Sequence, residues 1–135
     1  MTSPNKNFDA AIVNVAARQL QEFAASNSDV LLAVLTSSDG FEVASYPSER
    51  AMTPRIAAMS SSMQALSEAL TREAGLDKSR SLIIETDTGT VIVLGLQGTT
   101  PNVSLAVVAS GSELLGKLLW ATRNLCKTLE TSLRQ

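Results

Sequence analysis

The chain has 135 residues, of which 44% are hydrophobic, 18% are charged and 4% are aromatic, and its formal net charge is -2. A chain of this length buries roughly 65–70% of its unfolded surface around one core, so we expect a single domain. The sequence contains no histidine and one cysteine, Cys126. This composition excludes histidine-based acid–base catalysis, thiolate zinc sites and intramolecular disulfides, and it argues against an enzyme.

Charge and hydropathy argue against two further classes of protein. The near-neutral net charge and the lack of a basic run give no electrostatic footprint for nucleic acid. The chain does not open with a charged segment followed by an apolar one, and it has no run of about 18 apolar residues. We therefore expect a cytoplasmic protein without membrane insertion, cofactor or metal.

A helix and a hairpin are expected first. Apolar residues at helical spacing predict an amphipathic helix over residues 7–26, with Asn7 as its cap. The apolar run over residues 30–36 is followed by Asp39-Gly40 and by a second apolar segment over residues 41–46. Because glycine tolerates the positive φ of tight turns, this pattern predicts a β-hairpin.

A second helix follows the hairpin. Thr53 is suited to cap its start, and Pro54 suits the first helical position, where a missing N–H costs nothing. The helical pattern continues to about Ala74, and Gly75 with the apolar Leu76 provides a C-terminal stop.

This second helix carries two stripes of side chains. The first consists of large apolar residues that we expect to pack on a sheet: Ile56, Met59, Met63, Leu66 and Leu70. The second lies about 100° around the helix and consists of small residues: Ala58, Ser62, Ala65 and Ala69. Small residues at this spacing let another helix approach closely. Two interpretations stay open: this flank packs within the chain or faces water, or it pairs with the same helix of a second copy across a two-fold axis.

Three strands on short connections come next and predict an antiparallel meander. They cover residues 81–87, 90–96 and 103–109, with a turn at Thr88-Gly89 between the first two. The first strand contains three adjacent apolar residues without proline or lysine: Leu82, Ile83 and Ile84. If this strand lies at a sheet edge, it would pair with the same strand of a second subunit. The alternative is that it is central or covered locally.

A long helix closes the chain, and a capping-box pattern, Ser110-Gly111-Ser112-Glu113, predicts its start. The segment 111–118 nearly matches a phosphate-binding loop, but the position of the magnesium-binding hydroxyl is Leu118, so we interpret the match as accidental. Trp120 falls on the polar face of this helix, either as a contact site or as a lid over the first helix. Cys126 is expected to be an inert, buried thiol.

The order helix, two strands, helix, three strands, helix resembles the Roadblock family, which includes dynein light chains and bacterial regulators of Ras-like GTPases. The resemblance covers residues from about 10 to 133. It is carried by VLLAVLTSSDGFEVAS (30–45), by the alanine-rich second helix, and by VSLAVVAS (103–110) leading into a leucine-rich helix. It divides the chain into a tail, residues 1–6, and a Roadblock-like domain, residues 7–135.

The resemblance implies an α+β fold and a mode of assembly. Family members have a five-stranded antiparallel sheet with the middle helix on one face and the terminal helices on the other. They dimerise by joining sheets edge to edge and by pairing the middle helices. This would place strand 81–87 and the small-residue stripe at the two-fold axis, in agreement with the interpretation of both features as contacts with a second copy.

The resemblance also implies a function without catalytic residues. Bacterial members bind a small GTPase through the surface around the paired helices, so we expect a homodimeric, non-catalytic regulator of a Ras-like GTPase. The alternatives are a scaffold that ignores the nucleotide state and a small-ligand sensor. The candidate partner surface consists of Arg55, Met59, Ser60, Gln64, Ser67, Glu68 and Arg72, with Trp120 as an additional contact.

Overall fold

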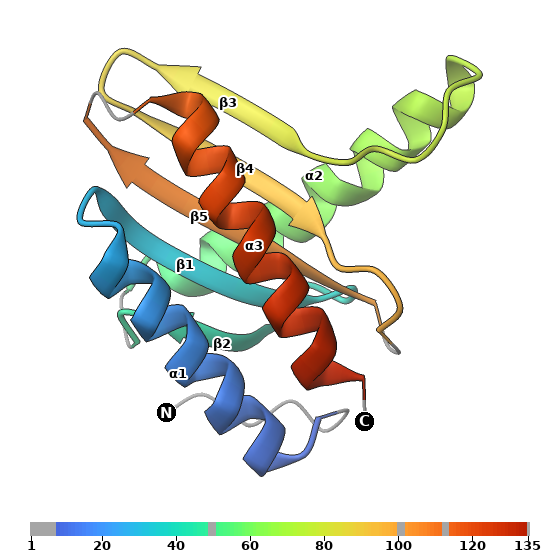
Figure 1. The fold of residues 1–135 in the computed structure, drawn as a ribbon. Coiled ribbons are helices and arrows are strands. Elements are labelled where there is room, and N and C mark those ends of the chain that lie inside the picture. Colours follow the sequence, from blue (N-terminus) through green and yellow to red (C-terminus); the bar gives the residue numbers. More distant parts are fainter. Residues whose placement is uncertain (1–7, 49–50, 100–101, 112–113, 135) are drawn as a thin grey trace.

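The computed structural model describes residues 8–48, 51–99, 102–111 and 114–134. Three helices enclose one five-stranded antiparallel sheet (Figure 1). In chain order the elements are α1 (Ala10–Ser26), β1 (Val30–Ser37), β2 (Glu42–Tyr46), α2 (Thr53–Glu73), β3 (Leu82–Thr86), β4 (Gly89–Gly95), β5 (Val103–Ser110) and α3 (Leu115–Leu133). This confirms the predicted fold class and element order.

The strands lie in the order β2-β1-β5-β4-β3, so β2 and β3 are the two edges of the sheet. All four pairings are antiparallel, and β3, β4 and β5 form the predicted meander. Helices α1 and α3 lie side by side on one face, and α2 crosses the other, as the resemblance implies (Figure 1). The carboxy-terminal part of α2 extends past the sheet (Figure 1).

Local contacts explain the first helix and the hairpin. Asp9 caps α1, because its carboxylate accepts a hydrogen bond from the Ala11 N–H at 2.9 Å. Asn7, the predicted cap, lies outside the described residues. In the β1–β2 turn, Gly40 adopts a φ of 90° and donates its N–H to the Ser37 carbonyl at 3.0 Å. The Asp-Gly prediction of a hairpin is confirmed.

The end of α2 follows the prediction and its start does not. Gly75 has a φ of 75°, its N–H donates to Arg72, and the Leu76 N–H donates to Thr71 at 2.8 Å. This is the Schellman arrangement that satisfies the last carbonyls of a helix. The predicted Thr53 cap is wrong: Met52 occupies the cap position, and the buried Thr53 hydroxyl has no hydrogen-bond partner.

Two other predicted boundaries also differ from the structure. Ser110 is the last residue of β5 and does not cap α3, which starts at Leu115 after Leu114 in extended conformation. The other two residues of the predicted capping box, Ser112 and Glu113, lie outside the described residues. The turn between β3 and β4 consists of residues 87–88, one position earlier than predicted.

The main core lies between the sheet and the pair α1 and α3. Its largest fully buried side chains come from both helices and from the sheet: Leu20 of α1, Leu35, Ile92 and Leu105 of the sheet, and Leu118 and Leu129 of α3. The core under α2 is much smaller. It contains only four buried residues, Val34, Ala57, Val93 and Ala106. The two faces of the sheet therefore differ strongly in how much apolar surface they bury.

Candidate functional site

The outward side of α2 carries the large apolar residues that the sequence pattern assigned to the sheet. Met59, Leu66 and Leu70 are 57%, 68% and 70% exposed. At 100° per residue these three positions fall within about 40° of one another, on the side opposite Ala57. The prediction that the stripe packs on the sheet is wrong for these three residues, whereas Ile56 does pack against the small core under α2. The buried residues that face the sheet are Thr53, Ala57 and Ser60.

The reason lies in the size of the side chains beneath the helix. On the α2 side of the sheet, β5 presents Ser104 and Ala106, and β4 ends in Gly95, where a Cβ atom would meet the Gln64 amide nitrogen at 2.7 Å. Small residues on both sides let the helix approach closely, and the large residues are then left on the outer side. Apolar side chains this exposed on one helix indicate a contact surface.

The small-residue stripe lies on the same outward side. All four of its residues, Ala58, Ser62, Ala65 and Ala69, are exposed. Together with Met59, Leu66 and Leu70 they form what we call the outer face of α2. It combines large apolar anchors with small positions where a second helix can approach.

Strand β3 provides the second part of the site, because it is an edge of the sheet as the prediction required. The side chain of Leu82 packs with the small core under α2, and that of Ile83 packs with the main core on the opposite face. Since side chains alternate along a strand, Ile84 points to the α2 side. It is 36% exposed, next to an open edge.

The backbone of β3 also offers hydrogen bonds at this edge. The Leu96 N–H, just after β4, donates to the carbonyl of Val103 in β5. Because backbone groups point alternately to the two sides of a strand, the even-numbered residues of β4 bond to β5 and the odd-numbered ones bond to β3. By this alternation Leu82 and Ile84 direct their backbone groups toward β4. Ile83 and Glu85 direct theirs toward the free edge.

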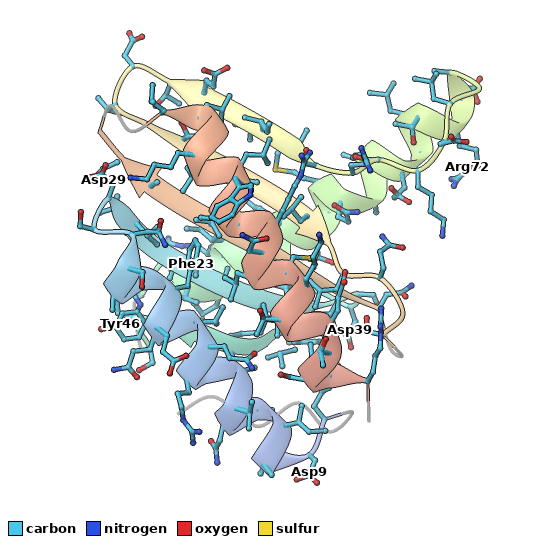
Figure 2. All side chains as sticks on the ribbon, in the orientation of Figure 1. Asp9, Phe23, Asp29, Asp39, Tyr46 and Arg72 are labelled. Atoms are coloured by element: carbon cyan, nitrogen blue, oxygen red, sulfur yellow. The ribbon has the colours of Figure 1, made fainter. Side chains whose placement is uncertain are left out.

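The structure separates the predicted partner-surface residues into three groups. Arg55, Met59 and Arg72 are exposed, and Figure 2 shows Arg72 near the end of α2 that extends past the sheet. Gln64, Ser67 and Glu68 are half-buried, and the Glu68 carboxylate accepts the Ser79 N–H at 3.0 Å. Ser60 is buried against the sheet, so its assignment to a partner surface is wrong.

Trp120 does not join this surface. It belongs to α3, on the other side of the sheet from α2 (Figure 1). Its side chain is 68% exposed although α1 lies beside α3, so the interpretation as a covered lid is wrong.

The groups capable of chemistry do not form a reactive centre in the part of the chain that the structure describes. Burial, reinforced by the Glu130 carboxylate at 3.6 Å, raises the pKa of Cys126 to about 12, which suits an inert thiol. Among the described residues no three acidic or cysteine side chains gather in a way that would hold a metal ion. Gly116 and Lys117 lie in the first turn of α3, so residues 115–118 of the segment resembling a phosphate-binding loop are helical. Of the helices described, none is both long and apolar enough to span a membrane.

This geometry agrees with a comparison against protein-family models. The model described as the Roadblock/LC7 domain matches residues 16–109. The chain belongs to the Roadblock/LC7 domain family. The matched region runs from α1 to the end of β5 and includes both the outer face of α2 and the edge strand β3.

Solved structures share this Roadblock fold at low sequence identity. A Roadblock/LC7 domain from Streptomyces avermitilis is 19% identical, with a TM-score of 0.79 over 88% of this chain and 98% of that chain. The gliding protein MglB from Thermus thermophilus is 17% identical, with a TM-score of 0.79 over 98% of both chains. An MglB structure described as having a tetrameric arrangement is 18% identical, with a TM-score of 0.80 over 98% and 97%. A comparison with curated proteins finds no match.

Sequence patterns missed part of the site. Leu66 and Leu70 were assigned to the core because a helical apolar stripe does not reveal which surface covers it. The opposite side of the same helix offered a signal, since Thr53, Ser60 and Gln64 are polar and Ala57 is small. A stripe of small and polar residues opposite a stripe of large apolar ones is the pattern of a helix that contacts two partners.

Proposed function

We propose that this Roadblock-domain protein forms a homodimer through the outer face of α2 and the edge of β3, and that the dimer binds and regulates a Ras-like small GTPase without being an enzyme. The observation that carries the proposal is the exposed row Met59, Leu66 and Leu70, which lies on the same side of the sheet as Ile84. Burying a leucine or methionine side chain contributes about 1.5–3 kcal/mol, so this row favours association.

The hydrogen-bond alternation restricts how two β3 edges can join. An antiparallel pair must match the outward-directed residues Ile83 and Glu85 with outward-directed residues of the second copy. All five residues of β3 pair only when the two-fold axis passes beside Ile84. In this register Ile83 faces Glu85 of the second copy, and the two Ile84 side chains meet on the α2 side of the joined sheet.

The two parts of the interface then reinforce each other. The Ile84 pair lies on the face that α2 crosses, so it would be covered by the paired α2 helices and not by the terminal helices. The small positions Ala58, Ser62, Ala65 and Ala69 allow the helices to approach, while Leu66 and Leu70 bury apolar area. A tetrameric arrangement described for one MglB structure of this fold is compatible with assembly beyond the monomer.

The exposed ends of α2 provide the surface for the GTPase. Arg55 lies in the first turn of α2 and Arg72 in the last, and both are exposed. Arginine suits recognition of the carboxylates on a partner surface. To regulate the GTPase, the dimer must bind its GTP-loaded and GDP-loaded forms with different affinities, because a ligand shifts a conformational equilibrium only by its differential affinity.

The test is a titration of the protein with a purified Ras-like small GTPase of the same organism, loaded with GDP or with a non-hydrolysable GTP analogue. We expect tighter binding to the GTP-analogue form, and we expect Arg55→Glu and Arg72→Glu to weaken it while Arg18→Glu, on the exposed side of α1, does not. Equal binding to both forms, or no binding to either, would reject the regulatory function.

The alternative is a structural dimerisation module that ignores the nucleotide state. It predicts the same dimer, so the oligomeric state does not distinguish the two functions. Equal affinity of a dimer for both nucleotide forms, or co-purification with a partner that is not a GTPase, would favour the scaffold.

A further inference from the structure

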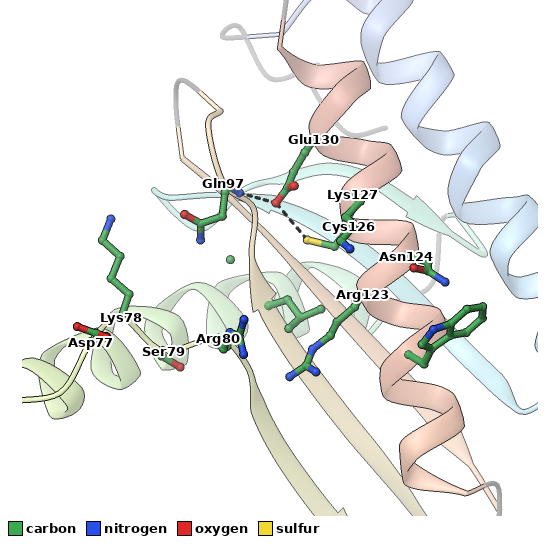
Figure 3. Close-up of a pocket in the computed structure, with 13 residues that line it drawn as sticks. Asp77, Lys78, Ser79, Arg80, Gln97, Arg123, Asn124, Cys126, Lys127 and Glu130 are labelled. Carbon is green, nitrogen blue, oxygen red and sulfur yellow. Dashed lines mark hydrogen bonds between the residues drawn. The ribbon is translucent and has the colours of Figure 1, made fainter.

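A second surface lies on the opposite side of the sheet from the outer face of α2. It is a groove of about 810 Å³ between α3, the end of β4 and the segment 77–80 that leads into β3 (Figure 3). We propose that this groove binds an acidic, extended peptide segment of a partner protein. The proposal does not depend on the proposed function, because it uses none of the residues of the α2 face.

Positive charge is concentrated along the groove. Four exposed cations line the groove, Lys78 and Arg80 from one wall and Arg123 and Lys127 from the other (Figure 3). They are four of the eleven lysines and arginines of a chain whose formal net charge is -2. Such a concentration of positive charge in an otherwise slightly acidic molecule favours an anionic ligand.

The acidic residues of the groove do not cancel this charge. Only Asp77 and Glu130 line it, against four cations. The Glu130 carboxylate is already engaged, since it accepts the Gln97 N–H at 2.7 Å and lies 3.6 Å from the Cys126 sulfur (Figure 3). Glu130 therefore holds the segment after β4 against α3, and its carboxylate is occupied by contacts within the chain.

An exposed indole lies at one end of the groove. Trp120 lines the groove, is 68% exposed, and is the only tryptophan of the chain. An aromatic side chain of this size beside exposed arginines is typical of a contact that becomes buried on binding. An apolar residue of the peptide would pack on it.

The shape favours an extended peptide over a compact anion. From Trp120 to Glu130 the groove follows ten residues of α3, a length of about 15 Å. This length accommodates roughly four to five residues of extended chain. At the opposite wall, β4 extends two residues beyond its pairing with β3. Leu82, the first residue of β3, pairs with Val93, whereas β4 continues to Gly95. Gly95 directs its backbone groups away from β5, where an extended chain can use them.

A second copy of the chain is a competing source of negative charge. In the register proposed for the β3 edges, Asp87 of the second copy would face Ser81, next to Arg80. Arg123 and Lys127 lie on α3, away from that edge, so they distinguish the two sources. Reversing the charge of Arg123 or Lys127 should lower the affinity for an acidic peptide and leave the dimer unchanged.

The experiment uses the full chain and the emission of Trp120 as an internal reporter. The probe is a nonapeptide of glutamate and aspartate with one central leucine, compared with the same peptide carrying glutamine and asparagine. We expect a saturable shift of the emission to shorter wavelength with the acidic peptide only. We also expect binding to weaken as the salt concentration rises, because exposed charges are screened.

Matched variants test the site. Arg123→Glu should weaken binding at least fivefold, whereas Arg18→Glu, which makes the same charge change on α1, should leave it unchanged. The proposal is overturned if the acidic peptide does not change the emission, or if Arg123→Glu binds as well as the unmodified chain. It is also overturned if inorganic phosphate at the same concentration produces the full shift, or if Arg123→Glu dissociates the dimer.

Discussion

Large apolar side chains are buried on one face of the sheet and exposed on the helix that covers the other face. Under α1 and α3, leucine and isoleucine side chains interlock in a core whose central members are fully buried. Under α2 the fully buried contact consists of alanine, valine, serine and threonine, with Ile56 and Leu82 at its margin, and the leucines of that helix point outward. The first face provides the stability of the domain. The second leaves apolar surface available for another molecule.

This difference separates what a substitution should do on each face. A large residue removed from the main core creates a cavity and lowers the free energy of unfolding. A large residue removed from the outer face of α2 removes no packing within the chain and should change only assembly.

The largest expected effect is in the main core. Leu105 of β5 is fully buried, and Leu105→Ala should lower the free energy of unfolding by about 2–5 kcal/mol, through lost burial and the cavity that remains. Denaturant unfolding followed by circular dichroism measures it. The matched variant Leu66→Ala should change the unfolding free energy of the monomer at high dilution by less than about 0.5 kcal/mol. Comparable losses in both variants would contradict the separation of the two faces.

The next effect concerns assembly. Ala65→Arg places a bulky charge at the centre of the small-residue stripe and should convert the dimer to monomers, as measured by light scattering. Asn14→Arg, which adds the same charge on the exposed side of α1, is the control and should remain dimeric. A dimer that persists in Ala65→Arg would mean that another side of α2, or another element, forms the interface.

A smaller effect is expected at the ends of two helices. Gly75 needs its positive φ to end α2, and a Cβ atom there would meet no neighbour, so Gly75→Ala should cost about 1 kcal/mol through backbone strain alone. Gly116 has equally open space and lies in the first turn of α3, in helical conformation. Gly116→Ala should therefore stabilise the protein by about 0.5 kcal/mol. Denaturant midpoints of the two variants should move in opposite directions.

At neutral pH the smallest effect is that of Cys126, because its contribution depends on pH only above pH 9. Because burial raises its pKa to about 12 from 9.0, the folded chain holds the thiol proton more tightly than the unfolded chain. The stabilisation is complete below pH 9 and is lost as the pH rises from 9 toward 12. Comparison of Cys126→Ser with the unmodified chain over this range isolates the contribution, and a stability difference independent of pH would contradict it.

Much of the fold follows from local patterns. The Asp-Gly hairpin, the glycine stop of α2 and the apolar runs of the meander are set by residues close in sequence, so their predictions were confirmed. The caps predicted at Thr53 and Ser110 were wrong because a capping residue type does not fix the boundary when packing places it elsewhere.

The sites were harder to predict because they depend on contacts distant in sequence. The apolar stripe of α2 was identified, but its direction depends on the small residues that β4 and β5 bring under the helix. No local sequence pattern predicts the basic groove, because Arg80 and Arg123 line the same groove only when α3 packs beside the end of β4. The exposure of Trp120 likewise depends on how closely α1 approaches α3.

In the proposed dimer, the outer face of α2 and the edge of β3 form one interface around a two-fold axis at Ile84. In that register the two Ile84 Cα atoms form a non-hydrogen-bonded pair about 4.5 Å apart, which is within the range for a disulfide. Ile84→Cys should therefore form a covalent dimer under mild oxidation, while Cys126 stays buried and unreactive. Thr86→Cys, on the same face of the strand but about 13 Å from its counterpart, should not. Failure of Ile84→Cys to cross-link, or equal cross-linking of Thr86→Cys, would contradict the interface.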